Sequence, residues 1–245
     1  MMRIDILTLF PELFKPFIST SIMGRAIDNN LVNINTHNIR DFAKNKHRQV
    51  DDYPYGGGAG MVMAVQPLYD ALDHVIGLHD LKPTIIYLSP QGRVLDQAMV
   101  ADYSRHTNII LLCGHYEGID QRVIDKYVDQ EISIGDYVLT GGELAAMVFV
   151  DSVTRLIPGV LGSSDSILEE SHTNHLLEYP HYTRPSNYKG DKVPEVLLSG
   201  NHKEIDRWRR TQSLKNTLIK RPDMLSKAEL SDEDQMLLKE LKEHK

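Results

Sequence analysis

The pattern of apolar and polar positions predicts five strands in the first two-thirds of the chain. They cover Ile4–Leu9, Val32–Ile39, Thr84–Leu88, Asn108–Cys113 and Glu131–Ile134. Two of them, Thr84–Leu88 and Asn108–Cys113, are continuous apolar runs. Such runs are typical of parallel strands that are buried on both faces of a sheet.

Segments with apolar residues at helical spacing separate these strands. The predicted helices cover Ser21–Asn29, Pro67–Ile76, Asp96–Tyr103, Asp120–Val128 and Gly142–Leu156. Strands that alternate with helices are typical of an α/β domain with a mostly parallel sheet. We therefore predict this fold class for the first part of the chain.

The pattern changes after residue 161. The stretch 162–171 is polar, has no periodicity and is predicted to be a flexible linker. Strand patterns end there, so the remainder is predicted to be a small helical domain. The predicted organisation is an α/β domain over 1–161, the linker, and a helical domain over 172–245.

The helical domain is predicted to contain two helices. The first covers Asn201–Ile219, with Ser199 or Asn201 able to cap its N-terminus. The second covers Lys227–Lys242, with Ser231 as an interruption. No internal repeat accompanies them.

Composition limits the classes of protein that need consideration. The chain has 245 residues, a formal net charge of −7 and one cysteine, Cys113, which cannot form an internal disulfide. No apolar run approaches the roughly 20 residues of a membrane span, and the N-terminus does not resemble a signal peptide. These features predict a cytoplasmic protein without membrane association.

Positive charge is concentrated in one segment of this acidic chain. From Arg184 to Arg221 there are ten Lys and Arg residues against four acids, whereas the tail from Asp223 carries seven acids and four Lys. A basic band of this kind is typical of a polyanion-binding surface. A helix with a solvated charged face explains it equally well, so both interpretations stay open.

The segment "DYPYGGGAGM", Asp52–Met61, is rich in glycine but does not by itself indicate which ligand would bind. Gly60 is followed by Met61 and Val62 instead of the Lys-Ser/Thr pair of a P-loop, and the spacing of its glycines does not fit a dinucleotide fingerprint. Glycine allows close backbone approach and unusual dihedral angles. Taken alone, the segment is better interpreted as a tight turn.

Small residues follow three of the predicted strands. The segments are Ser89–Gly92, Gly114–Gly118 and Gly135–Glu143. Ligands of open α/β sheets bind at the carboxyl ends of strands. One such loop is weak evidence, but three in one domain favour a shared binding site.

Eight stretches resemble one protein family and occur in its order over nearly the whole chain. They are "LTLFPE" from Leu7, "VDDYPYGGGAGM" from Val50, "LSPQG" from Leu88, "CGHYEGID" from Cys113, "EISIGDYVLTGGEL" from Glu131, "RLIPGVLG" from Arg155, "PHYTRP" from Pro180 and "VLLSGNH" from Val196. The sequence resembles the bacterial tRNA (guanine-N1)-methyltransferases of the TrmD type, in the SPOUT class. Together the stretches are highly specific.

The resemblance implies properties that composition and periodicity do not show. It implies a deep trefoil knot in the first domain, although knots are rare in general. It also implies S-adenosylmethionine as methyl donor, N1 of guanosine 37 in the tRNA anticodon stem-loop as acceptor, and a homodimer. Sites of the family lie between the N-terminal domain of one subunit and the C-terminal domain of the other. A requirement for Mg²⁺ stays open, because no protein motif for it is present.

The chemistry of guanine N1 calls for two kinds of side chain. N1 carries a proton that must leave before its lone pair can react, so the reaction needs a base. Negative charge then spreads onto O6, which needs a cation or hydrogen-bond donor. The resemblance assigns the base to Glu170 and the O6 contact to Arg155. The family pattern has Asp at the position of Glu170, and the neighbouring Glu169 is an alternative.

The resemblance also implies two sets of binding residues. The donor is expected to contact Tyr87, Leu88, Ser89, Pro90, Gly114, Tyr116, Glu117, Ser133, Ile134, Gly135, Asp136, Tyr137, Val138, Leu139, Gly141 and Gly142. The tRNA is expected to contact Gly58, Gly60, His181, Arg184, Ser199, Asn201 and His202. On this interpretation the glycine-rich segment faces the guanosine and the donor.

Several other residues have weaker claims to a function. His172 and His175 have a spacing that would suit a metal pair on a helix, but without an acid or cysteine cluster we predict no metal site. Cys113 is expected in the core. Trp208, among arginines, either stacks on RNA or packs inward.

Two positions, His115 and Ala145, depart from the residues of many relatives, which have Arg and Pro there.

Two other functions are less consistent with the sequence. A catalytically silent tRNA-binding protein is disfavoured by Arg155 and Glu170. An enzyme for another RNA position is disfavoured by "PHYTRP" and "SGNH".

Overall fold

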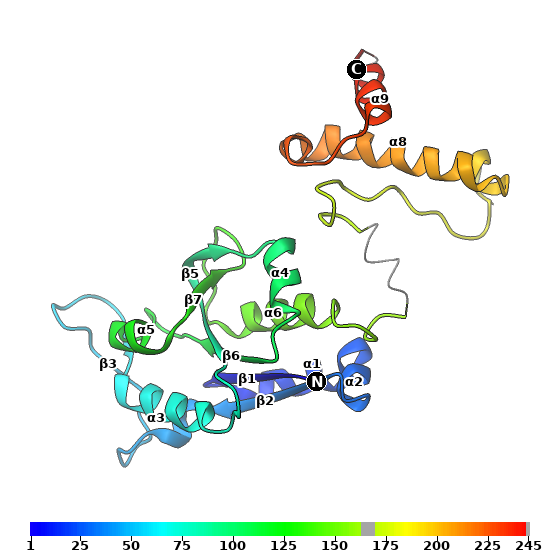
Figure 1. The fold of residues 1–245 in the computed structure, drawn as a ribbon. Coiled ribbons are helices and arrows are strands. Elements are labelled where there is room, and N and C mark those ends of the chain that lie inside the picture. The colour runs from blue at the N-terminus through cyan, green and yellow to red at the C-terminus, as the bar shows by residue number, and fades with distance from the viewer. Residues whose placement is uncertain (163–169, 244–245) are drawn as a thin grey trace. The chain divides into compact units, whose positions relative to one another are not determined.

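The computed structural model describes residues 1–162 and 170–243 (Figure 1). The chain forms two compact units, Met1–Gly162 and Ser163–Lys245. We refer to them as the first and the second unit.

The first unit is built on a five-stranded, fully parallel sheet. Its strands are β1 (Met2–Thr8), β2 (Val32–Asn38), β5 (Thr84–Val94), β6 (Asn108–Cys113) and β7 (Gln130–Ser133). Their order in the sheet is β2-β1-β6-β5-β7. The predicted α/β class with a parallel sheet is confirmed, whereas the knot stays a prediction from the resemblance.

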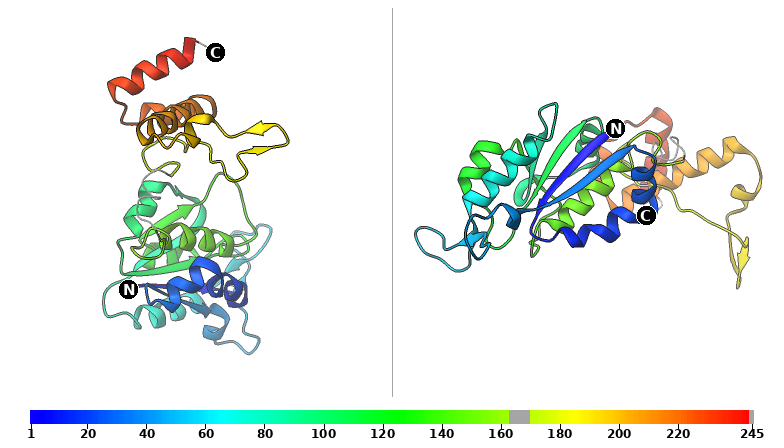
Figure 2. Two further views of the ribbon diagram at one scale, coloured as in Figure 1. Left: turned by 90° about the vertical axis from the view of Figure 1, so that its right-hand side faces the viewer. Right: turned by 90° about the horizontal axis from the view of Figure 1, so that it is seen from below.

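Helices cover both faces of this sheet (Figures 1 and 2). Helices α1 (Phe14–Ser19), α2 (Ser21–Asp28), α4 (Gln97–Tyr103) and α6 (Glu143–Thr154) lie on one face, and α3 (Val65–Ile76) and α5 (Gln121–Tyr127) lie on the other. Neighbouring residues of a strand point to opposite faces, so Ile86 packs in one apolar cluster while Ile85 packs in the other. Burial on both faces explains the continuous apolar runs.

Strand β5 is longer than predicted. The segment Ser89–Gly92 was expected to be a loop, but it lies within the strand, where the pairing with β7 shifts register between Leu88 and Arg93. A Cβ at Gly92 would lie 2.4 Å from backbone atoms of Glu131 and Ile132. The close approach of β7 therefore requires glycine at this position, and the sequence pattern alone does not reveal it.

Short elements were missed in the first unit. They are the helix α1, the 3₁₀ turns η1 (Pro11–Leu13) and η2 (Ile39–Phe42), and the antiparallel strands β3 (Asp51–Asp52) and β4 (Val62–Met63). The two short strands pair and carry the glycine-rich loop between them. Strands of two residues are too short to show the alternation of apolar and polar residues by which a strand is predicted.

The second unit contains a hairpin as well as helices, so the prediction that strands end after residue 161 was wrong. Strands β8 (Asn187–Tyr188) and β9 (Asp191–Lys192) pair around a turn at Lys189 and Gly190, both with positive φ. The helical elements that follow are η3 (Glu195–Leu198), α8 (His202–Lys220), η4 (Pro222–Ser226) and α9 (Asp232–Glu243).

The N-termini of the two long helices are capped by side chains. Asn201 caps α8, since its Oδ1 accepts from the backbone N–H of Glu204 at 3.4 Å. Helix α9 begins later than predicted, after Ser231. The Ser231 hydroxyl accepts from the N–H of Asp234 (3.2 Å), while the Asp234 carboxylate accepts from the N–H of Ser231 (2.9 Å). This reciprocal pair is a capping box.

Asp234 gives the second unit a predictable sensitivity to acid. Hydrogen bonds from Arg210 (2.9 and 2.8 Å), opposed by burial and aided by Ser231, lower the pKa of Asp234 to about 2. Because the folded pKa lies below the ordinary value of about 4, the ionised carboxylate stabilises the unit above that value, and this stabilisation is lost as the pH falls toward 2. We expect about 1–2 kcal/mol of unfolding free energy to depend on it.

Urea unfolding of the full chain as a function of pH tests this expectation, with fluorescence of Trp208, the one tryptophan, reporting on the second unit. Asp234→Asn should flatten the acid limb of the curve. Asp223→Asn is the matched control, because its ion pair with Arg221 (2.7 Å) is exposed and should contribute little. An unchanged acid limb in Asp234→Asn would contradict the assignment.

Among the described residues, no helix combines the length and apolar character of a membrane span.

Candidate active site

A cavity of about 220 Å³ opens at the carboxyl ends of β6 and β7 and beside the middle of β5 in the first unit. We call it the strand-end cavity. Its walls are formed by Tyr87, Leu88, Ser89, Pro90, Gln91, Gly114, His115, Tyr116, Glu117, Gly118, Ile132, Ser133, Ile134, Gly135, Tyr137, Val138, Leu139, Thr140, Gly141, Gly142 and Ala145. The structure thus brings together the three segments that follow the predicted strands.

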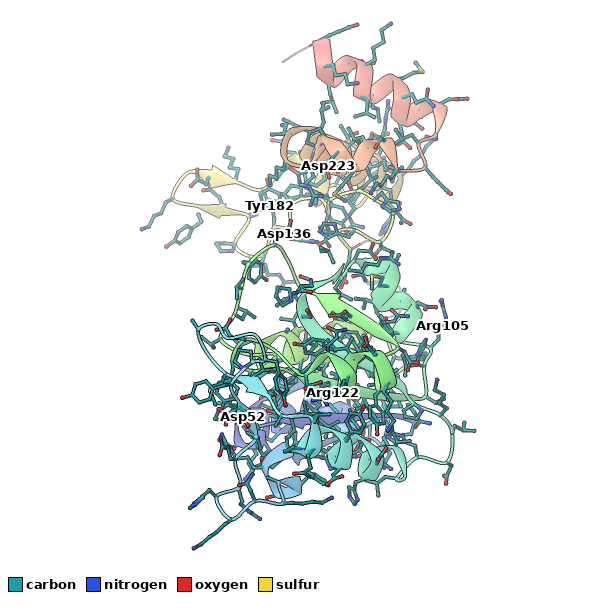
Figure 3. All side chains as sticks on the ribbon, turned by 90° about the vertical axis from the view of Figure 1, so that its left-hand side faces the viewer. Asp52, Arg105, Arg122, Asp136, Tyr182 and Asp223 are labelled. Carbon is teal, nitrogen blue, oxygen red and sulfur yellow. The ribbon has the colours of Figure 1, made fainter. Side chains whose placement is uncertain are left out.

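All the residues expected to contact the donor line this cavity except Asp136. Asp136 is exposed and lies at the outer turn of the loop after β7 (Figure 3). The sequence reasoning missed Gln91, His115, Gly118, Ile132, Thr140 and Ala145. The sequence could have indicated them, because each lies within or directly beside one of the stretches that resemble the family.

Backbone contacts hold the loops around the cavity close together. The N–H of Gly142 donates to the carbonyl of Gly114 at 2.9 Å, and His115 and Gly141 form an isolated antiparallel bridge. A Cβ at Gly142 would lie 2.8 Å from Cα of Cys113. The absence of a side chain at Gly142 therefore allows the loop after β6 to contact the start of α6.

The loop after β7 turns sharply and presents apolar side chains. Ser133 Oγ donates to the carbonyl of Gly135 (2.9 Å) and accepts from its N–H (3.1 Å), and Gly135 has φ +148°. Tyr137, Val138 and Leu139 follow as exposed residues on the cavity wall. Exposed apolar residues on a cavity wall suit a ligand with an apolar surface.

Tyr87 lines the cavity, whereas Cys113, the last residue of β6, does not. Burial, together with the neighbouring Glu131 carboxylate, raises the pKa of Tyr87 to about 12, so its hydroxyl keeps its proton. Burial also raises the pKa of the Cys113 thiol, which lies fully in the core as predicted. Cys113 is therefore a packing residue and not a reactive thiolate.

The glycine-rich segment forms an exposed loop between β3 and β4. Gly56, Gly57, Gly58 and Gly60 have φ values of +86°, +79°, +134° and +83°. A Cβ at Gly60 would lie 2.5 Å from the side chain of Glu117, which lines the strand-end cavity. The loop is a turn that requires glycine, and it also reaches the edge of the cavity.

Arg155 and Glu170 belong to different units. Arg155 is half-buried and directly follows α6 in the first unit, where its N–H donates to Asp151 at 3.2 Å. Glu170 is half-buried in the second unit. Glu169 lies outside the described residues.

Glu170 lines a separate cavity of about 190 Å³ within the second unit. The other residues of this cavity are Asn174, Leu176, Tyr179, Asp206, Arg209, Arg210 and Ser213. The guanidinium of Arg209 lies over the ring of Tyr179, 5.0 Å from its centroid. Two arginines thus share the cavity with the Glu170 carboxylate.

The residues expected to contact tRNA in the second unit are all exposed. They are His181, Arg184, Ser199, Asn201 and His202. The ring of His181 lies 2.8 Å from Glu178, and the N–H of Asn201 donates to Ser199 Oγ at 3.1 Å. Part of this set therefore shapes the start of α8.

The basic band of α8 is partly neutralised by acidic side chains. Arg210 pairs with Asp234 at 2.8 Å and Arg207 with Glu233 at 3.5 Å. Trp208 is half-buried, with its ring 6.3 Å from that of Tyr182. Ion pairs therefore offset part of the positive charge on α8, and both interpretations of the basic band stay open.

Within residues 1–162 and 170–243, no group of three His, Cys, Asp or Glu residues is arranged to hold a metal ion. His172 and His175 have φ values of +77° and +54° and lie in turns. The two histidines therefore do not share one face of a helix.

Comparisons with known proteins agree on one family. The family model described as tRNA (Guanine-1)-methyltransferase TrmD matches residues 2–227. A protein of Ruminiclostridium cellulolyticum is 59% identical over 92% of this chain and 97% of its own length. One of Clostridioides difficile is 57% identical over 93% and 99%, and one of Pelotomaculum thermopropionicum is 58% identical over 98% and 96%. All three are named tRNA (guanine-N(1)-)-methyltransferase.

Proposed function

Because the chain belongs to the TrmD family of tRNA (guanine-1)-methyltransferases, we propose that it transfers a methyl group from S-adenosylmethionine to N1 of guanosine 37 in tRNA. Family membership supports methylation of N1 of guanine in tRNA. We propose in addition that S-adenosylmethionine is the donor, that guanosine 37 is the acceptor, and that Glu170 and Arg155 act on the guanine. The observation that carries it is the strand-end cavity, which part of β5 and the loops after β6 and β7 form together.

The residues of this cavity fit S-adenosylmethionine. Gly114 and Gly142 leave backbone accessible to a flat base, and Tyr137, Val138 and Leu139 offer apolar contact. Glu117 supplies a carboxylate for the positive charge of the donor. When bound, the donor supplies a methyl group that its positively charged sulfur already activates.

Two side chains of this protein act on the guanine. Glu170 removes the proton from N1, and the lone pair that remains forms the new bond to the methyl carbon as the bond from that carbon to sulfur breaks. The sulfur leaves as a neutral thioether, so charge and atoms balance. Arg155 stabilises the negative charge that develops on O6.

The direct test is incubation of the protein with labelled S-adenosylmethionine and unmodified tRNA, followed by mapping of the methylated base. We expect label on N1 of guanosine 37. Binding of tRNA without methyl transfer would instead favour a catalytically silent binding protein. Label at another nucleotide would identify an enzyme for another RNA position.

The proposal includes a homodimer in which each site takes Arg155 from one chain and Glu170 from the other. Mixing inactive Arg155→Ala and Glu170→Ala proteins should then restore activity, because a heterodimer keeps one site with both side chains intact. Activity of purified heterodimers measures the effect. Pairing Arg155→Ala with the Arg155→Ala/Glu170→Ala double variant is the matched control, since no site then has Arg155. Verified heterodimers that gain nothing over either parent would count against shared sites.

A further inference from the structure

A buried carboxylate, Glu143, lies behind the strand-end cavity. It is the first residue of α6 and is only 4% exposed. It does not line the cavity, and it has no role in the reaction proposed above. A buried carboxylate is unfavourable unless hydrogen bonds or charges compensate it.

One oxygen of Glu143 is fixed by the end of β1. Thr8 Oγ1, itself fully buried, donates to Glu143 Oε1 at 2.8 Å. The same hydroxyl oxygen accepts from the N–H of Phe10 at 3.0 Å. Because a hydroxyl has one proton, this arrangement sets the direction of both hydrogen bonds and holds the carboxylate in place.

The other oxygen of Glu143 faces two residues of the cavity wall. Glu143 Oε2 lies 3.9 Å from His115 Nε2, and it lies 2.4 Å from the position that a Cβ at Gly141 would occupy. His115 and Gly141 are bridged to each other. Glu143 therefore supports the contact between the loop after β6 and the loop after β7.

The place of Glu143 in α6 favours its negative charge. It occupies the first turn, where unpaired backbone N–H groups and the helix dipole stabilise an anion. The carboxylate thus joins the end of β1, the start of α6 and two cavity loops.

We propose that Glu143 is a positioning residue that fixes the spacing of the loops after β6 and β7 and thereby sets the affinity for the methyl donor. The inference rests on the proposed function, because it takes S-adenosylmethionine as the ligand of the strand-end cavity. Glu143 acts through His115 and Gly141 and does not contact the donor. Its substitution therefore affects donor affinity more than the rate at saturating donor.

Two measurements separate the effect on donor affinity from the effect on the rate. They are calorimetry with S-adenosylmethionine and single-turnover methylation at saturating donor. Glu143→Gln keeps the size of the side chain and removes its charge, and we expect about tenfold weaker donor binding. The single-turnover rate should change by less than about threefold. Thr8→Val and Thr8→Ser form a matched pair, because only the first loses the hydroxyl that donates to Glu143. Thr8→Val should weaken donor binding, and Thr8→Ser should bind as the native protein does.

The outcomes are distinguishable. A native protein that does not bind S-adenosylmethionine would refute the proposed function itself. If the native protein binds the donor and a folded Glu143→Gln binds it equally well, Glu143 is not a positioning residue. Thermal unfolding without donor establishes folding. Should Glu143→Gln not fold, the Thr8 pair decides by the same criterion, and equal donor affinity of the two variants overturns the inference.

Discussion

Glu170→Gln is expected to lower the single-turnover rate of guanine methylation by about 10²–10⁴-fold, the usual contribution of a general base. Gln keeps the size of the side chain but cannot accept the N1 proton. Proton removal matters only on the way to the transition state, so donor affinity should change little. Rapid-quench methylation of unmodified tRNA, with calorimetry of donor binding, measures both quantities.

Two companion variants test the assignment of the base. Glu169→Gln is the control and should remain close to the native rate. Glu170→Asp tests the departure from the family residue: it should be slower if the surrounding segment is adapted to the longer side chain, and nearly as fast if that segment is pliable. A near-native rate in Glu170→Gln with a collapse in Glu169→Gln would move the base by one residue. If neither variant is impaired, this segment supplies no base.

Gly141→Val is expected to abolish donor binding while the first unit stays folded. A Cβ at this position would lie 2.4 Å from Glu143 Oε2 and 2.6 Å from the His115 ring, so both side chains would have to move. Gly141 lines the strand-end cavity, and such movement would change the shape of its wall. The two groups are side chains and not backbone, so the strain can be relieved locally.

The measurement for Gly141→Val is calorimetry with S-adenosylmethionine, accompanied by thermal unfolding. Gly162→Val provides the matched control, because a Cβ at Gly162 would meet no atom within 4 Å. It should bind the donor like the native protein. Normal donor affinity in a folded Gly141→Val would show that the donor binds elsewhere.

Two strands of the sheet, β6 and the first part of β5, could be predicted because burial on both faces leaves a continuous apolar run. Strand β6 (Asn108–Cys113) has the predicted bounds. The extension of β5 through Gly92 could not be predicted, because a close approach of the β7 backbone determines it and apolar spacing does not. The hairpins β3–β4 and β8–β9 were missed for another reason, since strands of two residues carry no period.

The walls of the strand-end cavity could be predicted in outline, because parallel strands end at one edge of a sheet. Glu143 could not be recognised in this way. Its hydrogen-bond partner, Thr8, is 135 residues away in the sequence, and nothing in the local pattern pairs them. The roles of Glu170 and Arg155 came from the resemblance, and they stay predictions for the experiments above.

The strand order of the sheet has a consequence for synthesis on the ribosome. Strand β1 pairs with β2 on one side and with β6 on the other, and in the second pair Arg3 is opposite Asn108. At about 5–20 residues per second, the edge of β1 that faces β6 remains open for roughly 5–20 s after β1 is made. Strand β5 also emerges before both of its neighbours, β6 and β7. Open strand edges are templates for association with other chains, so we expect the nascent first unit to be prone to association until Cys113 has left the exit tunnel, and we expect fragments that end before β6 to aggregate.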